Sequence, residues 1–310
     1  MFSQIIATIL LIISPTLFGE VGFLSGAINT PQKDFPVSFG PKISAKSALV
    51  FDLDQEKVLY QKNPDLVLPI ASITKLMSAL VFLDNNDLDW DEKIAITASD
   101  FKFKEESPYT KIDIPESGLK PKQLNIRPGS KMRVRDVLNA GLIGSLNNLL
   151  NTLARITIND NNEEFVDLMN QKAAELGMNN SFFVDPTGLS PKNYSTSRDL
   201  IILIKEAMNN SYLKKTLQRT RYDFTVYSQN GANLTFNVKN TDKLLNTFID
   251  FKGGKTGYLD ESGYCFVGIS RFENRNLAVT VLNSESSKAR FQEAKSLIWW
   301  SVDQLNLSKK

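Results

Sequence analysis

The sequence predicts an α+β fold in which helices cover one antiparallel sheet. Runs typical of strands stand at both ends of the chain, and amphipathic stretches with helical spacing fill the middle. The simplest architecture therefore pairs the N-terminal strands with the C-terminal strands and packs the central helices on them. The chain has 310 residues, of which 42% are hydrophobic, so it is long enough to bury a substantial core.

Short apolar runs bounded by turn residues indicate the strands. The first two runs flank a turn at Asp54–Glu56, and Asn230-Gly231 between two later runs is a strong hairpin signal. The strands predicted in this way cover residues 47–53, 57–60, 222–227, 234–238, 251–258, 263–272 and 277–282.

Apolar residues at helical spacing indicate the helices. Pro69 opens the first, Gly177 ends the third, and Thr196 with Asp199 is close to a capping box at the fourth. The predicted helices cover residues 70–83, 134–153 with a break near Gly144-Ser145, 162–176, 196–208 and 289–305, and a short helix is expected from Ser211. The polar stretch 101–130 is predicted to be a solvated loop, with contact to glycan strands or a partner as the alternative.

The first 27 residues differ from the remainder of the chain. Residues 5–18 are almost continuously apolar, and the small residues Ser25-Gly26-Ala27 follow. This pattern is typical of a signal peptide, although no Lys or Arg precedes Lys33, which leaves an uncleaved anchor open. We therefore predict a signal peptide or anchor at 1–27, a linker at 28–46 and an extracytoplasmic domain at 47–310. Any membrane attachment would be made through the N-terminal segment.

The composition excludes several kinds of catalytic site. The chain contains no histidine and a single cysteine, Cys265, which lies in an apolar run and is expected to be buried. Ser-His-Asp and Cys-His catalysis, histidine zinc sites and an intramolecular disulfide are therefore excluded. The net charge of +2 creates no overall field for nucleic acid. Acid–base chemistry must use Lys, Asp, Glu, Tyr or water.

Without histidine, a lysine is the best candidate to activate a nucleophile. A serine three residues before a lysine on a helix shares a face with it, and a desolvated, neutral lysine can accept the serine proton. Ser72 and Lys75 fit this pattern near the start of the first helix. Ser99-Lys102 and Ser211-Lys214 have the same spacing but are expected to be solvated, so the spacing alone is weak evidence.

Two further elements strengthen the prediction. Ser145-Leu-Asn147 falls at the helix break, where a hydroxyl and an amide can project into a cleft, whereas the similar triplet Ser228-Gln-Asn230 is better explained by the hairpin turn. Lys255-Thr-Gly257 lies on a predicted strand, where a cation and a hydroxyl can bind a substrate carboxylate and a glycine allows close approach. SxxK, S-x-N-type and KTG elements occur together in penicillin-binding proteins and class A β-lactamases.

With these residues the sequence resembles the serine-type D-Ala-D-Ala carboxypeptidases, the low-molecular-weight penicillin-binding proteins of peptidase family S11. Further segments are similar to the family's patterns over about residues 45–305. These segments are Leu68–Leu80, Arg127-Pro-Gly129, Val134-Arg-Asp136, Phe165–Leu189 and Gly254–Tyr258 followed by Gly263-Tyr264. The resemblance implies a β-lactamase/transpeptidase-like fold, with an antiparallel five-stranded sheet flanked by helices and a helical subdomain at about 84–215.

The resemblance also implies roles in catalysis. Ser72 would attack the carbonyl between two D-alanines at the end of a peptidoglycan stem peptide, with Lys75 as general base. Ser145 would relay a proton to the leaving D-alanine, and backbone N–H groups of Ser72 and of the residue after Gly257 would form the oxyanion hole. Water would then release the peptide. β-Lactam antibiotics would act as inhibitors by acylating Ser72, and neither a metal nor a cofactor is required.

The remaining site residues would bind substrate. The resemblance assigns Asn147 to the substrate amide and Lys255 with Thr256 to the terminal carboxylate, beside Gly257, and places Arg290 near that carboxylate. One residue departs from the family's pattern, because Leu146 replaces the usual glycine of the second motif. A bulky side chain there is expected to shift Asn147 or narrow the cleft.

Other activities on the same fold stay open. A D,D-endopeptidase would use the same catalytic residues. A class A β-lactamase needs a glutamate-positioned water, but Glu163, Glu164 and Glu175 are all predicted to be helical and the segment 183–189 contains no Glu. A non-catalytic penicillin-binding cell-wall sensor is supported only by Leu146.

Overall fold

The computed structural model describes residues 40–102, 126–158, 162–245 and 247–307. The predicted signal peptide or anchor at 1–27, most of the linker at 28–46 and most of the loop at 101–130 lie outside the described residues.

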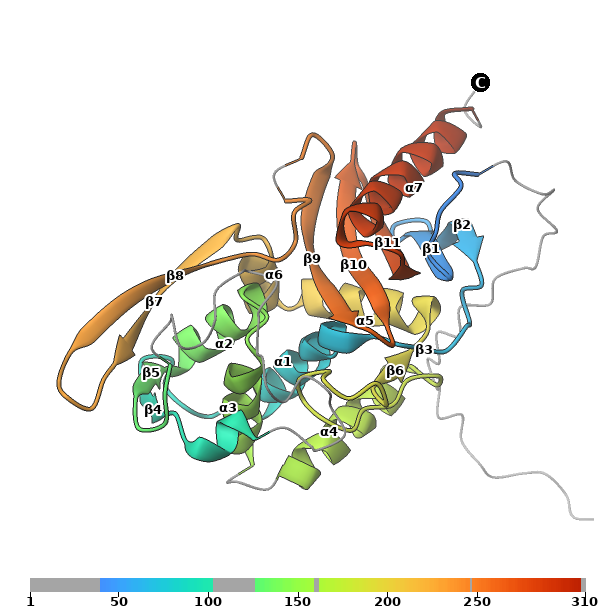
Figure 1. Cartoon of the computed structure of the whole chain (residues 1–310). Helices are drawn as coiled ribbons and strands as arrows, with labels where there is room; N and C mark the ends of the chain where they lie inside the picture. The colour runs from blue at the N-terminus through green and yellow to red at the C-terminus, as the bar shows by residue number, and fades with distance from the viewer. Residues whose placement is uncertain (1–39, 103–125, 159–161, 246, 308–310) are drawn as a thin grey trace, which may run out of the picture. The chain divides into compact units, whose positions relative to one another are not determined.

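The central element is a five-stranded antiparallel sheet with the strand order β2-β1-β11-β10-β9 (Figure 1). Its strands are β1 (Ser47–Asp52), β2 (Lys57–Lys62), β9 (Asp250–Leu259), β10 (Gly263–Phe272) and β11 (Arg275–Ser284). β1 pairs with β11, so that Ser47 lies opposite Leu282 and Asp52 opposite Leu277. This pairing confirms the prediction that strands from both ends of the chain form one antiparallel sheet.

Helices cover both faces of this sheet, as the alternation of side chains along β1 requires. Ala48 and Val50 pack in one core with α7, whereas Leu49 and Phe51 belong to a second core with the other helices. Figure 1 shows α7 on one face and α5 on the other. The helices are α1 (Thr74–Asn85), α2 (Val134–Ile143), α3 (Asn147–Thr157), α4 (Asn162–Glu175), α5 (Ser197–Asn209), α6 (Ser211–Leu217) and α7 (Ser287–Leu307).

The predicted hairpin around Asn230-Gly231 belongs to a second sheet and not to the central one. Its strands β7 (Arg221–Tyr227) and β8 (Asn233–Lys239) join β4 (Lys93–Ala95) and β5 (Lys131–Arg133) in the order β4-β5-β7-β8. This sheet lies at the left of Figure 1. A two-stranded pair, β3 (Leu68–Pro69) with β6 (Tyr194–Ser195), stands next to the start of α1.

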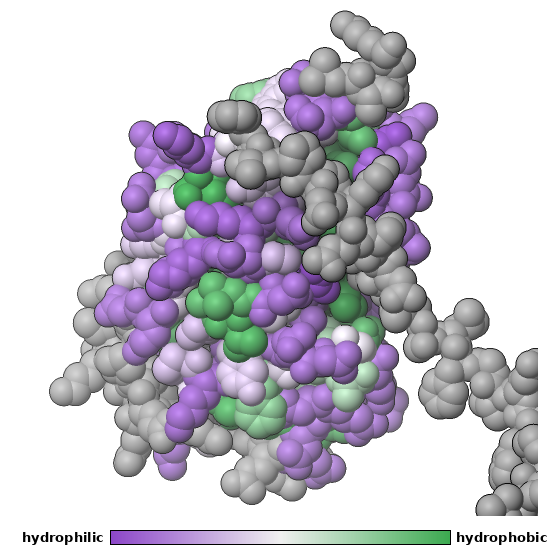
Figure 2. Space-filling model, turned by 90° about the vertical axis from the view of Figure 1, so that its right-hand side faces the viewer, coloured by the Kyte–Doolittle hydropathy of each residue, from purple (hydrophilic) through white to green (hydrophobic). Residues whose placement is uncertain are grey.

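The surface on the side of β2 in Figure 1 is mostly hydrophilic. Figure 2 shows this face, where apolar side chains form a few separate patches between polar ones. In the described part of the chain, no helix combines the length and the hydropathy needed to cross a bilayer.

Candidate active site

Ser72 and Lys75 lie where a 3-10 turn, Ala71–Ile73, leads into α1. Ser72 is half-buried, whereas the side chain of Lys75 is fully buried. Because three residues separate them on a helical turn, the two side chains share a face, and Lys75 Nζ donates a hydrogen bond to Ser72 Oγ at 2.8 Å. A half-exposed hydroxyl therefore stands next to a buried amine.

Two further oxygen atoms fix the position of the Lys75 amine. Nζ donates to Asn147 Oδ1 at 2.5 Å and to the carbonyl oxygen of Thr187 at 2.5 Å. Asn147 is the first residue of α3, and Thr187 lies in the loop between α4 and β6. Segments from three parts of the chain thus meet at one nitrogen atom.

The loop that holds Thr187 is organised by one carboxylate. Asp185 Oδ1 accepts hydrogen bonds from the Thr187 and Gly188 backbone N–H groups, and Oδ2 accepts from Ser190 N–H and the Asn193 side chain. Gly188 has φ +80°, and a Cβ built there would lie 2.0 Å from the carbonyl oxygen of Ala71. Only a glycine lets this loop pack so closely against the turn that holds Ser72.

Ser145 and Lys255 form a second serine–lysine pair. Ser145 stands between α2 and α3 with φ +56°, a left-handed conformation that is uncommon for serine and is found at functional sites. Lys255 on β9 is buried, and its Nζ donates a hydrogen bond to Ser145 Oγ at 2.9 Å. Asn147, two residues after Ser145, contacts Lys75, so both pairs lie in the same region.

β9 brings Thr256 and Gly257 to this region as the edge strand of the central sheet. The buried Thr256 hydroxyl donates to Thr241 Oγ1 at 2.8 Å. A Cβ on Gly257 would lie 2.4 Å from the carbonyl oxygen of Ile70 and 3.3 Å from the backbone nitrogen of Ser72. Glycine is therefore required where β9 passes the nucleophile turn.

Arg290 of α7 is buried behind this strand. Its Nη1 donates to the carbonyl oxygens of Gly257 at 3.0 Å and Cys265 at 3.4 Å. The guanidinium therefore holds the backbone of β9 and β10 next to the KTG motif, and its contact with a substrate carboxylate stays a prediction. Cys265 itself is buried, as its apolar surroundings predicted.

The interpretation that Leu146 narrows the cleft is wrong in this structure. Leu146 is 1% exposed and belongs to the large hydrophobic core. The left-handed conformation of Ser145 sends the chain into α3 with Leu146 turned inward, while Ser145 and Asn147 contact the two lysines. The Leu146 side chain therefore packs in the main hydrophobic core, behind the Ser145–Asn147 motif.

The other serine–lysine repeats lie on the surface, as predicted. Ser99 is exposed and bonds to Thr97 in a short 3-10 turn, and Ser211 is exposed at the start of α6. The Ser228–Asn230 triplet forms the turn between β7 and β8. The glutamates considered for a β-lactamase water all fall within α4.

Sequence reasoning missed a buried carboxyl group near these residues. Asp242 follows Thr241, the partner of Thr256, and is buried. Its Oδ1 accepts the Leu244 N–H at 2.8 Å, whereas its buried Oδ2 has no hydrogen-bond partner in the described structure. The sequence around Asp242 matches none of the motifs described above, and the burial of its carboxyl group depends on how the loop before β9 packs.

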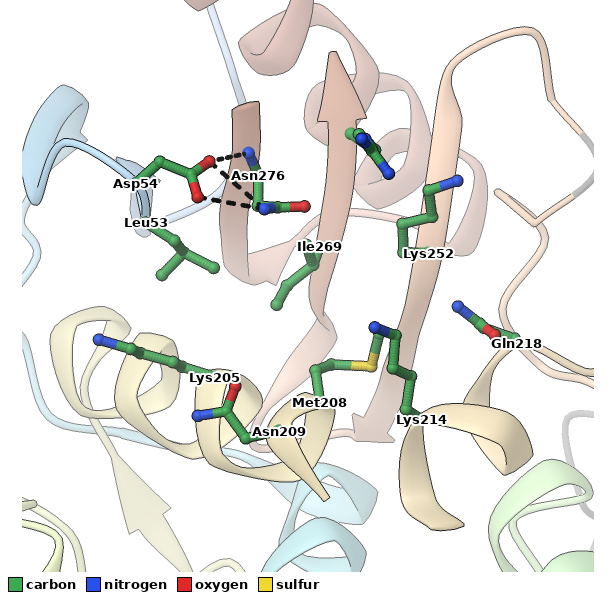
Figure 3. A pocket seen from close by; sticks show the side chains of 11 residues that line it. Leu53, Asp54, Lys205, Met208, Asn209, Lys214, Gln218, Lys252, Ile269 and Asn276 are labelled. Carbon is green, nitrogen blue, oxygen red and sulfur yellow. Dashed lines mark hydrogen bonds between the residues drawn. The ribbon is translucent and has the colours of Figure 1, made fainter. Parts of the chain in front are cut away.

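A separate pocket of about 460 Å³ opens between α5, α6 and the central sheet (Figure 3). None of the candidate site residues lines it. At one edge Asp54 accepts hydrogen bonds from the backbone and side-chain amides of Asn276. The lining residues are Leu53, Asp54, Lys205, Met208, Asn209, Lys214, Gln218, Lys252, Ile269, Arg271 and Asn276.

Comparison with known proteins identifies the class to which this fold and site belong. A family model described as peptidase S11, D-alanyl-D-alanine carboxypeptidase, matches residues 33–286. The chain therefore belongs to this family of serine DD-peptidases, hydrolases that act on cell-wall peptidoglycan. Action on the cell wall implies an extracytoplasmic location, and the resemblance inferred from the motifs is confirmed.

The similar proteins have related activities. The chain is 33% identical over 286 residues to a D-alanyl-D-alanine endopeptidase of Pseudomonas aeruginosa, an alignment that covers 92% of this chain and 86% of that protein. It resembles the structure of the Streptomyces K15 DD-transpeptidase with a TM-score of 0.76 and 26% identity, over 86% of this chain and 100% of that one. It also resembles penicillin-binding protein D2 of Listeria monocytogenes in a cefotaxime-bound form, with a TM-score of 0.67 and 28% identity, over 86% of this chain and 100% of that one. These comparisons confirm the predicted five-stranded fold.

Proposed function

We propose that the protein is a serine-type D,D-carboxypeptidase that removes the terminal D-alanine from peptidoglycan stem peptides through an acyl-enzyme on Ser72. The central observation in support is the 2.8 Å hydrogen bond between the buried Lys75 amine and the half-exposed Ser72 hydroxyl. In a chain without histidine, this pair is the best candidate for an activated nucleophile.

In the acylation step, Ser72 Oγ attacks the carbonyl carbon between the last two D-alanines, and its proton passes to a neutral Lys75. Lys75 Nζ lies within hydrogen-bond distance of Ser72 Oγ, which is the geometry that a general base requires. Backbone N–H groups of Ser72 and Tyr258 hold the developing oxyanion. Gly257 supports this geometry, because β9 passes the Ser72 turn closely at that residue.

In the second half of the step, the C–N bond breaks and the leaving amine takes a proton from Ser145. Lys255 Nζ, 2.9 Å from Ser145 Oγ, resupplies the hydroxyl proton. Lys75 then releases the proton it took and Lys255 takes one up, which resets both amines. Water attacks the carbonyl carbon of the Ser72 ester and gives a proton to neutral Lys75, the C–O bond to Ser72 breaks, and Ser72 Oγ takes that proton from Lys75 as the shortened peptide leaves with its new carboxyl group.

The residues that bind the substrate lie on strand β9 and at the start of helix α3. Lys255 and Thr256 bind the terminal carboxylate, with Arg290 behind the strand, and Asn147 binds the substrate amide. β-Lactams have a carboxylate and a strained amide, and they acylate Ser72 in the same way. The cefotaxime-bound form of a similar protein supports this proposal.

An endopeptidase is the second candidate, because the Pseudomonas relative is named as one and its alignment spans 92% of this chain. Both reactions cleave next to a D-amino acid with the same residues. We also propose that the apolar segment at 1–27 directs export, as a signal peptide or as an anchor.

The two activities can be separated with two substrates. The purified protein is incubated with a stem pentapeptide and, separately, with a cross-linked muropeptide dimer, and the products are measured by mass spectrometry. We expect loss of one D-alanine from the pentapeptide, and no reaction for the Ser72→Ala variant. Cleavage of the dimer with an untouched pentapeptide would contradict the carboxypeptidase and favour the endopeptidase.

A further inference from the structure

The pocket between α5, α6 and the central sheet is lined by an excess of cations. Four positively charged side chains and one carboxylate line its volume of about 460 Å³. The cations come from four different elements, namely Lys205 of α5, Lys214 of α6, Lys252 of β9 and Arg271 of β10. Figure 3 shows the three lysines around one opening. The whole chain has a net charge of +2, so the excess of positive charge is local to this pocket.

The carboxylate in the lining does not pair with these cations. Both oxygens of Asp54 accept hydrogen bonds from Asn276 at the edge of the pocket. The partner that holds Asp54 is therefore a neutral amide, and the positive charges of the pocket are left for other anions.

Two of the lysines form ion pairs with acids that do not line the pocket. Lys252 Nζ lies 2.6 Å from Asp250, and Lys205 Nζ lies 4.0 Å from Glu56. Both carboxylates are exposed, and exposed ion pairs contribute little free energy because water and salt screen them. These lysines can therefore exchange their surface partners for a bound ligand at little cost.

The uncharged lining residues suit a peptide better than a bare anion. Leu53, Met208 and Ile269 supply apolar surface, and the last two are buried. Asn209 and Gln218 supply side-chain amides, which can donate to and accept from a peptide backbone. The volume lies within the range of about 300–1,000 Å³ that is usual for ligand pockets. Apolar surface, amides and cations together match a short peptide that carries carboxylates.

We propose that this pocket binds a short acidic peptide, namely a second stem peptide of the peptidoglycan on which this family acts. The four cations bind its carboxylates, and the two amides bind its backbone. The polymer presents many stem peptides at once, so a protein that cleaves one can hold another. Binding at the second site is then intramolecular, which keeps the protein on the polymer between reactions. This inference adds a binding site to the proposed function and does not depend on acylation of Ser72.

Zero-length cross-linking tests which lysines contact the peptide. A stem tetrapeptide, the product of the proposed cleavage, is incubated with the protein and a carbodiimide, which joins a carboxylate to a neighbouring lysine amine. Mass spectrometry of proteolytic fragments then locates the cross-links. We expect cross-links to the lining lysines several-fold above those to Lys215, an exposed lysine of α6 that does not line the pocket. Lys215 is therefore an internal control within the wild-type protein.

A pair of double variants tests the role of charge. Lys214→Gln with Arg271→Gln removes two exposed cations from the pocket. Lys215→Gln with Arg221→Gln is the matched control, since it removes two exposed cations outside the pocket. Cross-linking at Lys205 and Lys252 should fall several-fold in the pocket variant and stay at the wild-type level in the control.

Inorganic pyrophosphate, added as a competitor, tests the class of the ligand. For a peptide site, the unmodified tetrapeptide should suppress cross-linking of a mass-labelled tetrapeptide at lower concentrations than pyrophosphate does. Stronger suppression by pyrophosphate would assign the pocket to phosphate-bearing chains and overturn the peptide.

The outcomes separate this inference from the proposed function. Cross-links to the lining lysines no stronger than those to Lys215, or unchanged in the pocket variant, overturn the inference. The proposed function still stands in that case if benzylpenicillin acylates Ser72. Cross-links in the pocket without acylation of Ser72 support the inference and overturn the proposed function alone. The wild-type comparison with Lys215 needs no variant, so it decides the question even if a double variant fails to fold.

Discussion

The carbonyl oxygen of Thr187 accepts a hydrogen bond from Lys75 Nζ at 2.5 Å, across 112 residues of chain. The candidate base is therefore positioned by a loop that contains neither a nucleophile nor a cation of the three motifs. Asp185 orders this loop, and Ser78 of α1 donates a hydrogen bond to the Pro186 carbonyl oxygen at 2.6 Å. The conformation of this loop therefore helps to determine where the Lys75 amine lies relative to the Ser72 hydroxyl.

Substituting Gly188 tests this link. Gly188→Ala would place Cβ 2.0 Å from the Ala71 carbonyl oxygen, so the loop must move away from the Ser72 turn. A displacement of about 1 Å at the base can cost about 100-fold in acylation rate. Benzylpenicillin acylation, followed by intact mass, measures the effect.

Gly177→Ala is the matched control, because Gly177 also has a positive φ but its Cβ would meet nothing within 4 Å. Both variants lose about 1 kcal/mol to the left-handed conformation, and only Gly188→Ala should lose acylation. Equal losses of activity in the two variants would contradict a positioning role for the loop.

Replacement of Lys75 by arginine tests the base. A guanidinium keeps the positive charge but stays protonated, so it cannot accept the Ser72 proton. Lys75→Arg should lower the acylation rate by about 10²–10⁴-fold. Thermal unfolding provides the control for folding, and a folded variant with near-normal acylation would exclude Lys75 as the base.

Leu146 is expected to matter for stability rather than for turnover. It is buried in the main core, so Leu146→Ala should lower the free energy of unfolding by about 2–5 kcal/mol. Denaturant unfolding measures this loss, and acylation at a temperature where the variant is folded should be unchanged. An unchanged stability with faster acylation would show that the leucine crowds the cleft after all.

The charge of Asp242 also predicts how stability depends on pH. Its folded-state pKa is raised to about 6 from 3.8, so the folded protein binds this proton more tightly than the unfolded chain. The stabilising contribution of the protonated acid is complete below the unfolded value and is lost as the pH rises through about 6. Asp242→Asn should therefore gain about 1–3 kcal/mol relative to the wild type above that pH.

Urea unfolding at several pH values measures this difference. Asp250→Asn serves as the control, because its carboxylate is exposed. A difference between Asp242→Asn and the wild type that stays constant from acidic to alkaline pH would contradict the raised pKa.

Local patterns predicted the elements of the fold well, because spacing and turn residues act over short distances. The run at 263–272 is β10, and Thr196 caps α5 by accepting the Asp199 N–H. The helix break at Gly144-Ser145 is also present, between α2 and α3. The hairpin at Asn230-Gly231 was predicted, but its membership in a second sheet depends on long-range pairing that no local pattern encodes.

The site was predictable where its chemistry is concentrated in short motifs, and less so elsewhere. Ser72, Lys75, Ser145 and Lys255 were found because spacing on a helix or strand fixes which side chains share a face. The inward orientation of the Leu146 side chain was not predicted, since it depends on the left-handed conformation of the preceding serine. Thr187 acts through its backbone carbonyl, which no side-chain pattern reveals.

The most direct test of the acyl-enzyme is peptide mapping after reaction with benzylpenicillin. The protein is allowed to react, its intact mass is measured, and proteolytic peptides locate the modified residue. We predict one stable adduct on the peptide that contains Ser72, and none in Ser72→Ala. An adduct on another serine, no adduct at all, or rapid destruction of penicillin without an accumulated adduct would contradict the account.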